Sequence, residues 1–242
     1  MRIHFIVHES FEAPGVYEAW ARSRGHAVSY SKVYQGEPLP ASAGGIDLLI
    51  VMGGPQSPAT TKDECPHFNA AAEISLIAKC VAARRAVIGV CLGSQLIGEA
   101  LGARFAHSPE KEIGKFPIVL TSDGLANEKF SHFGDRLEVG HWHNDMPGLT
   151  PEAKIVAYSE GCSRQIVEYS KRVYGFQCHM EFNSEIIELL IANADPALEA
   201  LAHHRFVQQA DTLRQNDYSD MNAKLVVFLD KLSEEYKAFN VD

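Results

Sequence analysis

The sequence predicts an α/β fold with three layers, in which helices flank a mostly parallel central sheet. The first observation is a series of short apolar runs with the composition of buried strands, at residues 2–7, 26–33, 47–52 and 86–90. The second is the helical periodicity of residues 14–24 and 66–84, which separate these runs. Strands that alternate with helices are typical of βαβ units and of a parallel sheet.

The second half of the chain predicts additions to this sheet. Strand-like runs with short turns between them occupy residues 103–107, 113–120, 136–142, 153–158 and 165–169. Such spacing indicates antiparallel strands, before an apolar strand at 173–178 returns to the core. From Ser184 onward the pattern is helical, with a break at Pro196. We therefore expect one domain over 1–185 that carries the site, and a helical C-terminal extension, 186–242, packed on the same domain.

The composition excludes several classes of function. The chain has 242 residues and a net charge of −9, without a cluster of lysine and arginine that would favour nucleic acid or a membrane surface. No apolar run has the length of a membrane span, and the first residues are too short an apolar run for a signal peptide. The cysteines, at 65, 80, 91, 162 and 178, show neither a disulfide framework nor metal-type spacing. We expect a cytoplasmic protein that uses no cofactor and no metal.

A cysteine stands where the apolar strand 86–90 gives way to a helix. Cys91 is followed by the helical pattern that begins at Leu92, and Gly89 and Gly93 lie two residues to either side. A strand that turns sharply into a helix exposes the side chain at its tip, and the helix N-terminus favours a thiolate. The pattern predicts a nucleophile, with glycines that let the backbone turn. A small buried cysteine without reactivity is the alternative.

A cysteine nucleophile needs a base, and the base needs a group that orients it. His179 and Glu181 lie two residues apart at the end of the strand predicted for 173–178. Alternation along an extended segment would place both side chains on one face, so the carboxylate could orient the imidazole. The alternative is a solvated histidine and a glutamate at a helix start, because Asn183 and Ser184 resemble an N-cap.

A third segment ends the strand predicted for 47–52 in a glycine turn, Gly53-Gly54-Pro55. An isolated turn of this kind is most often only a loop. Next to a cysteine nucleophile, the N–H group of Gly54 could instead receive the oxyanion that forms during attack on a carbonyl.

These segments, Gly-Gly-Pro, Gly-Val-Cys-Leu-Gly-Ser-Gln and Gln-Cys-His-Met-Glu, resemble the class I glutamine amidotransferase family, and in particular its free-standing members similar to the glutaminase domain of GMP synthase. The resemblance covers roughly residues 45–185 and implies the family's flavodoxin-like fold. It also implies roles for individual residues. The triad would be Cys91, His179 and Glu181, the N–H groups of Gly54 and Leu92 would form the oxyanion hole, and Gln95 and Gly53 would contact the substrate.

Residues 141–145 lie where the family carries a Ser-His-Gly-Asp-like loop on the substrate side, so the resemblance assigns His143, Asn144 and Asp145 to substrate binding. This segment lacks the family's glycine. His143 and Asp145 are therefore either substrate contacts or exposed loop residues. Met180 is a second departure, because the family usually has proline between the triad histidine and glutamate.

The resemblance implies hydrolysis of the γ-amide of glutamine through a thioester, with ammonia passed to an acceptor enzyme. The chain lacks a phosphate-binding loop and a synthase-type ATP motif, so the acceptor would be a separate synthase subunit. One alternative is a hydrolase of γ-glutamyl peptides or conjugates. Another is a non-catalytic, glutamine-sensing or regulatory subunit.

Overall fold

The structure, a computed structural model that describes residues 1–194 and 197–239, is organised around one ten-stranded sheet. Its parallel part has the order β2 (Ala27–Lys32), β1 (Arg2–Val7), β3 (Leu48–Val51), β4 (Ala86–Val90) and β9 (Val173–Phe176). Every residue of β3 and β4 is buried, as expected for strands covered on both faces. The predicted α/β fold with a mostly parallel core is confirmed.

Antiparallel strands continue the sheet beyond β9. They are β8 (Ile166–Ser170), β7 (Lys154–Tyr158), β5 (Ala106–Leu120) and β6 (Arg136–Met146), and the short β10 (Phe206–Val207) runs parallel to β5. The runs 103–107 and 113–120 thus form one long strand, with a bulge between His107 and Glu112. The prediction of a loop at 141–145 is wrong, because β6 pairs with β5 through this segment and continues to Met146.

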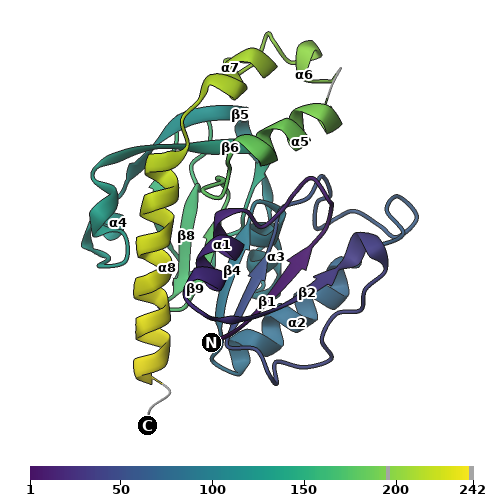
Figure 1. The fold of residues 1–242 in the computed structure, drawn as a ribbon, viewed down its shortest axis with the longest axis vertical. Coiled ribbons are helices and arrows are strands. Elements are labelled where there is room, and N and C mark those ends of the chain that lie inside the picture. Colours follow the sequence, from purple (N-terminus) through teal and green to yellow (C-terminus); the bar gives the residue numbers. More distant parts are fainter. Residues whose placement is uncertain (195–196, 240–242) are drawn as a thin grey trace.

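Helices cover both faces of the sheet (Figure 1). They are α1 (Val16–Ser23), α2 (Ala70–Ala82), α3 (Leu92–Ala100), α4 (Ser122–Ala126), α5 (Ser184–Ala194), α6 (Ala197–Ala200), α7 (Ala210–Gln215) and α8 (Ser219–Phe239), with single 3-10 turns η1 (Val33–Gln35) and η2 (Ser131–Phe133). Leu48 and Ile50 of β3 pack in the core under α1, α5 and α8, whereas Leu49 and Val51 pack in the core under α2 and α3. This alternation produces the three layers.

The start of one helix differs from the sequence pattern. The helix predicted over 66–84 begins only at Ala70, because the side chain of Asn69 accepts a hydrogen bond from the N–H of Ala72 and caps it. The break expected at Pro196 lies outside the described residues. No helix within the described ranges is both long enough and apolar enough to cross a membrane.

The C-terminal helix α8 runs along one side of the molecule (Figure 1) and attaches there through aromatic packing. The ring of Phe228 lies 4.8 Å from that of Phe130 and 5.2 Å from those of Tyr174 and Phe176, measured between centroids. Asp230 of the same helix accepts a hydrogen bond of 2.8 Å from Trp20 Nε1 in α1. The predicted helical tail is therefore present, and it covers part of the sheet.

Replacement of Phe228 by alanine should destabilise the protein by about 3–5 kcal/mol, because a fully buried aromatic ring leaves a cavity that the core cannot fill. Chemical denaturation followed by circular dichroism measures the free energy of unfolding. The matched control is Val227→Ala, since Val227 precedes it on the same helix and is 39% exposed. Equal losses in the two variants would contradict the packing role assigned to Phe228.

Candidate active site

Cys91 lies at the carboxyl end of β4, directly before the first residue of α3, in the strand–turn–helix geometry that the sequence predicts. Its backbone has φ 50° and ψ −108°, which is a strained conformation for a residue other than glycine. The Cys91 N–H donates a 2.7 Å hydrogen bond to the carbonyl of Phe176 at the end of β9. The strain therefore falls on the cysteine itself, and the neighbouring parallel strand holds it there.

The two flanking glycines have a different role from the one predicted. Neither has positive φ, so they do not make the turn. A Cβ atom on Gly89 would lie 2.3 Å from the carbonyl carbon and oxygen of Gly93, and one on Gly93 would lie 2.0 Å from the carbonyl oxygen of Val51. Glycine is required at both positions because α3 packs directly on the backbone of β3 and β4.

His179 and Glu181 follow β9 instead of lying within it, because this strand ends at Phe176, two residues before the predicted end. The His179 N–H donates to the carbonyl of Gly140 in β6 at 2.8 Å, and its ring stacks on Phe182 at 4.4 Å. His179 Nδ1 and Glu181 Oε1 are 2.7 Å apart, and both side chains are buried. The alternative of a solvated histidine is therefore wrong.

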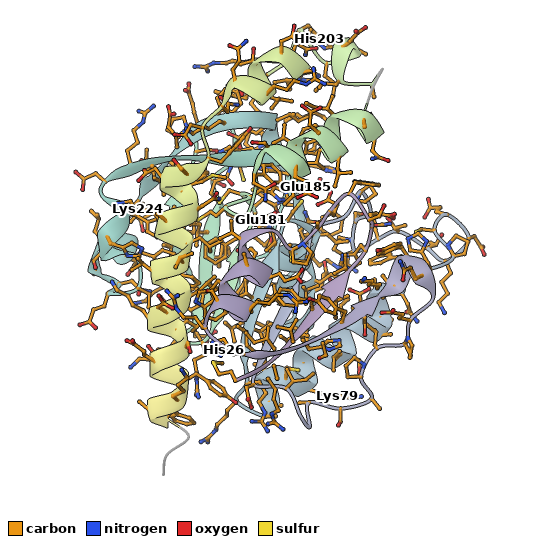
Figure 2. All side chains as sticks on the ribbon, viewed as in Figure 1. His26, Lys79, Glu181, Glu185, His203 and Lys224 are labelled. Carbon is orange, nitrogen blue, oxygen red and sulfur yellow. The ribbon has the colours of Figure 1, made fainter. Side chains whose placement is uncertain are left out.

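The segment that carries this pair is held by α8, in place of the proline that the family usually has. Met180 is fully buried, and Asn222 of α8 donates hydrogen bonds to the carbonyls of Met180 at 2.8 Å and Phe182 at 3.1 Å. These bonds restrain the peptide groups that follow Met180 and Phe182, so α8 limits the motion of the segment that carries His179 and Glu181. Figure 2 places Glu181 well inside the molecule, between α1 and α5.

The imidazole of His179 and the thiol-bearing side chain of Cys91 meet at Gly53. A Cβ atom on Gly53 would lie 3.3 Å from His179 Cε1 and 3.4 Å from Cys91 Cβ. Burial lowers the pKa of His179, but the charge of Glu181 and the proximity of Cys91 outweigh it, and the pKa is raised well above its usual value. His179 Nε2 has no other hydrogen-bond partner among the described residues. This arrangement suits proton exchange between the two side chains.

A buried ion pair, which sequence reasoning missed, fixes the Gly53–Gly54 turn. His8 Nδ1 donates to the Gly53 carbonyl at 2.9 Å, and His8 Nε2 donates to Glu73 at 2.8 Å. Burial lowers the pKa of His8, but the effects of Glu73 and the Gly53 carbonyl are together larger, so the pKa is raised above its usual value. The doubly protonated ring is therefore favoured. In a trans peptide the C=O and the next N–H point in opposite directions. The N–H of Gly54 is thus turned away from His8.

One feature of the sequence could have indicated a role for His8 in the site, namely its position directly after the first strand. Ligand sites of parallel sheets lie beyond the carboxyl ends of the strands. Its partner Glu73 stands on α2 in a pattern that resembles an ordinary solvated helix face. Leu92, the other predicted oxyanion donor, is the first residue of α3, where a backbone N–H has no partner within the helix.

A cavity of about 320 Å³ opens beside Cys91. Residues predicted for the oxyanion hole and residues predicted to bind the substrate both line it. Gly54, Gln95, His143, Asn144 and Asp145 all take part in this lining, whereas Gly53 lies behind it against His179. Gln95 Nε2 donates to Gln177 at 3.2 Å, which leaves the Gln95 Oε1 atom without a partner among the described residues. The structure thus brings the predicted site residues to one end of the sheet.

His143 and Asp145 are residues of strand β6 and both have partners on neighbouring segments. His143 is 6% exposed, and its Nε2 lies 3.3 Å from Glu112 Oε2 on the paired strand. Asp145 forms an ion pair of 2.5 Å with His107. Neither residue is an exposed loop residue, and both border the cavity.

Two clusters in the described residues have spacings that a metal ion could use. In each, the ligand atoms lie within 4.8 Å of one another: Glu112 with His141 and His143, and Glu9 with Cys65 and His67. Glu112 already accepts hydrogen bonds from Ser159 and Gln165, which accounts for its burial without an ion.

The fold and the site together define an α/β protein with a cysteine, histidine and glutamate at the carboxyl end of a parallel sheet. Residues 18–193 match the model of the family described as glutamine amidotransferase class-I. The chain therefore belongs to the class I glutamine amidotransferase family.

Particular relatives show how far the likeness extends. The chain is 56% identical to the glutamine amidotransferase-like protein YfeJ of Salmonella typhimurium over 96% of its own length and 98% of that protein. A crystal structure of a glutamine amidotransferase from Thermotoga maritima is 25% identical, with a TM-score of 0.84 and coverage of 96% of this chain and 97% of that one. One subunit of the glutamine-hydrolyzing GMP synthase from Methanococcus maripaludis is 28% identical over 60% of this chain and 70% of that protein.

The ion pair under the glycine turn can be tested with Glu73→Gln. Without the charge of Glu73, His8 becomes neutral. Its Nδ1–H can still donate to the Gly53 carbonyl while Nε2 accepts a hydrogen bond from the amide that the substitution introduces, but the bond to Gly53 is no longer charge-assisted. We expect turnover of glutamine to fall by about tenfold, since a neutral hydrogen bond holds the Gly53–Gly54 turn, and with it the Gly54 N–H, less strongly than a charge-assisted one. Steady-state ammonia release measures this. The control Glu64→Gln, whose side chain bonds only Thr61, should behave as the parent chain; a similar fall in both variants would contradict the assignment.

Proposed function

We propose that the chain hydrolyses the γ-amide of glutamine through a Cys91–His179–Glu181 triad and a thioester intermediate. The observation that carries this proposal is the convergence of the strained Cys91 and the buried His179–Glu181 pair on Gly53. An inert core cysteine requires neither positive φ nor an imidazole whose free nitrogen faces it. Family membership supports the same chemistry.

In the first half of the reaction, the Cys91 thiolate attacks the γ-carbonyl carbon. The resulting oxyanion accepts hydrogen bonds from the N–H groups of Gly54 and Leu92, both at the edge where Cys91 projects. As the C–N bond breaks, the leaving nitrogen takes the proton held by His179 and departs as ammonia. Glu181 keeps the ring oriented and stabilises its charged form throughout.

In the second half, His179 accepts a proton from a water molecule that attacks the thioester carbonyl. Breakage of the C–S bond then releases glutamate and restores Cys91. The oxygen of water takes the place of the amide nitrogen on the γ-carbon, so the overall reaction converts glutamine and water into glutamate and ammonia. The proposal requires no cofactor.

We propose further that the ammonia passes to a separate synthase subunit. The Methanococcus maripaludis protein, to which this chain is similar, is by name one subunit of such a synthase. The proposed location is the cytoplasm, and the free thiols of the described cysteines suit a reducing compartment.

The second candidate is hydrolysis of a γ-glutamyl peptide or conjugate, in which an amine larger than ammonia leaves. Two observations favour it. The cavity continues past Cys91 to Leu190, Asn193 and Ala194 of α5. Asn144 also stands where the family has a glycine, so the grip on the amino-acid end differs.

Cys91→Ala should abolish ammonia release while changing the free energy of unfolding little, because the small thiol is lost without opening a large cavity. A glutamine-mimicking electrophile should label Cys91 and no other cysteine, as mass spectrometry of the digested protein can show. Cys65→Ala, which removes a partly exposed thiol, should remain labelled and active. Glutamine binding without any labelling would instead support a regulatory subunit that senses glutamine.

A direct competition assay between glutamine and γ-glutamyl peptides distinguishes the two candidate functions. For a glutaminase, kcat/KM should be higher for glutamine than for γ-glutamyl peptides by about tenfold or more, with ammonia as the released amine. Turnover should be measured for the chain alone and with any synthase that co-purifies with it. Brisk release of amino acids from γ-glutamyl peptides, together with no ammonia from glutamine, would overturn the amidotransferase proposal.

A further inference from the structure

Glu12, in the loop between β1 and α1, is a nearly buried carboxylate without a partner. Its side chain is 8% exposed and lines the cavity beside Cys91. No hydrogen bond or ion pair joins this carboxylate to another residue within 1–194 or 197–239, although buried carboxylates normally have such partners. Burial raises the pKa of Glu12, and the neighbouring charges include His179, Glu181, His8 and Glu9, but no lysine or arginine is among them. The two histidines are bonded to Glu181 and Glu73, so Glu12 has no cation in direct contact among the described residues.

The position of Glu12 places it on the side of the cavity where the amine leaves. A Cβ atom on Gly53 would lie 2.5 Å from Glu12 Oε2 and 3.3 Å from His179 Cε1, so the carboxylate and the imidazole approach the same glycine. His179 protonates the leaving nitrogen in the proposed reaction. A group beyond that nitrogen would therefore extend toward Glu12.

Most of the side chains that line the cavity from the Glu12 loop and from α5 are apolar. Phe11, from the same loop, and Leu190 and Ala194, from α5, line it together with Glu12, and Asn193 is the polar residue that α5 contributes. The loop and the helix are in tight contact, since a Cβ atom on Gly15 would lie 2.6 Å from Ile186 Cδ1. Apolar side chains that lead to a carboxylate match a methylene chain that ends in an ammonium group.

The part of the lining that comes from α3, β5 and β6 has a different chemistry. Gln95, Lys111, Asn144 and Asp145 present polar and charged groups there, which suit the carboxylate and ammonium of an amino acid. Asp145 is already paired with His107 at 2.5 Å, whereas Glu12 has no such partner among the described residues. The two ends of a γ-glutamyl conjugate would thus meet distinct surroundings.

We propose that Glu12 is an ammonium subsite, and that the chain hydrolyses, beyond glutamine, γ-glutamyl amides of short linear diamines. This inference rests on the proposed function of Cys91. The thiolate forms the thioester with the γ-carbonyl, the C–N bond breaks, and His179 gives its proton to the leaving nitrogen, so the diamine departs. Hydrolysis by water then yields glutamate. Glu12 binds the distal ammonium and takes no part in bond making.

Binding can be measured without turnover in the Cys91→Ala variant. The probes are the γ-glutamyl amide of a linear diamine and a γ-glutamyl alkylamide in which a methyl group replaces the terminal ammonium. Calorimetry should show that the diamine compound binds about tenfold or more tightly, as expected for a charge-assisted hydrogen bond. Adding Glu12→Gln should reduce the ratio of the two dissociation constants to about one. Adding Glu9→Gln, a nearby carboxylate that bonds Gln56 and His67, should leave the ratio unchanged.

Equal affinity for the two compounds with Glu12 intact would overturn the subsite. So would an equal loss of affinity for both compounds in Glu12→Gln, because Glu12 would then bind the α-ammonium that they share. With Cys91 present, kcat/KM should favour the diamine compound by a similar factor. If neither compound nor glutamine released its amine, the proposed chemistry of Cys91 would fail, while the ratio of dissociation constants would still decide on Glu12.

Discussion

The backbone of Cys91 is the constraint on which the site depends. A non-glycine residue with φ near 50° carries strain of about 1–3 kcal/mol, which persists only where surrounding contacts determine the conformation. Those contacts lie on both sides of the residue. The Cys91 N–H is bound by Phe176, and its carbonyl accepts bonds from the backbone N–H of Ser94 at 3.0 Å and the Ser94 hydroxyl at 2.7 Å. The thiol is therefore fixed at the rim of the sheet, before any substrate binds.

Pairing between β4 and β9 then brings the base to the nucleophile. Val90 pairs with Phe176, so the residues that follow each strand emerge side by side although more than eighty positions separate them in sequence. The strands β5 to β8 fill this interval and return the chain to the parallel core. β6 also contributes the Gly140 carbonyl that holds His179, and α8 contributes Asn222. The added strands and the tail thus position the base in addition to completing the fold.

The sequence was sufficient to predict the parallel core, the elbow at Cys91 and the family, because these depend on local patterns. It was insufficient where a partner from a distant segment decides the outcome. His141 and His143 belong to a segment expected to form a loop, but pairing with β5 makes them buried strand residues opposite Gly114 and Glu112. Glu73 has the pattern of a helix surface residue, yet it is fully buried against His8. No local pattern contains these partners, so spacing alone could not indicate them.

The buried acids of the described residues show how this fold balances charge around the site. Glu73, Glu112 and Glu181 are each at most 2% exposed, and each lies beside an imidazole: His8, His143 and His179 respectively. Such pairing offsets the loss of hydration, since an isolated buried carboxylate is costly. Histidine also suits a site in which protons move, because its two ring nitrogens can hold a carboxylate and act on a second group. Glu12 lies near His179 but forms no bond with it, because that ring is held by Glu181. It borders the cavity, where a cationic ligand would supply a direct partner.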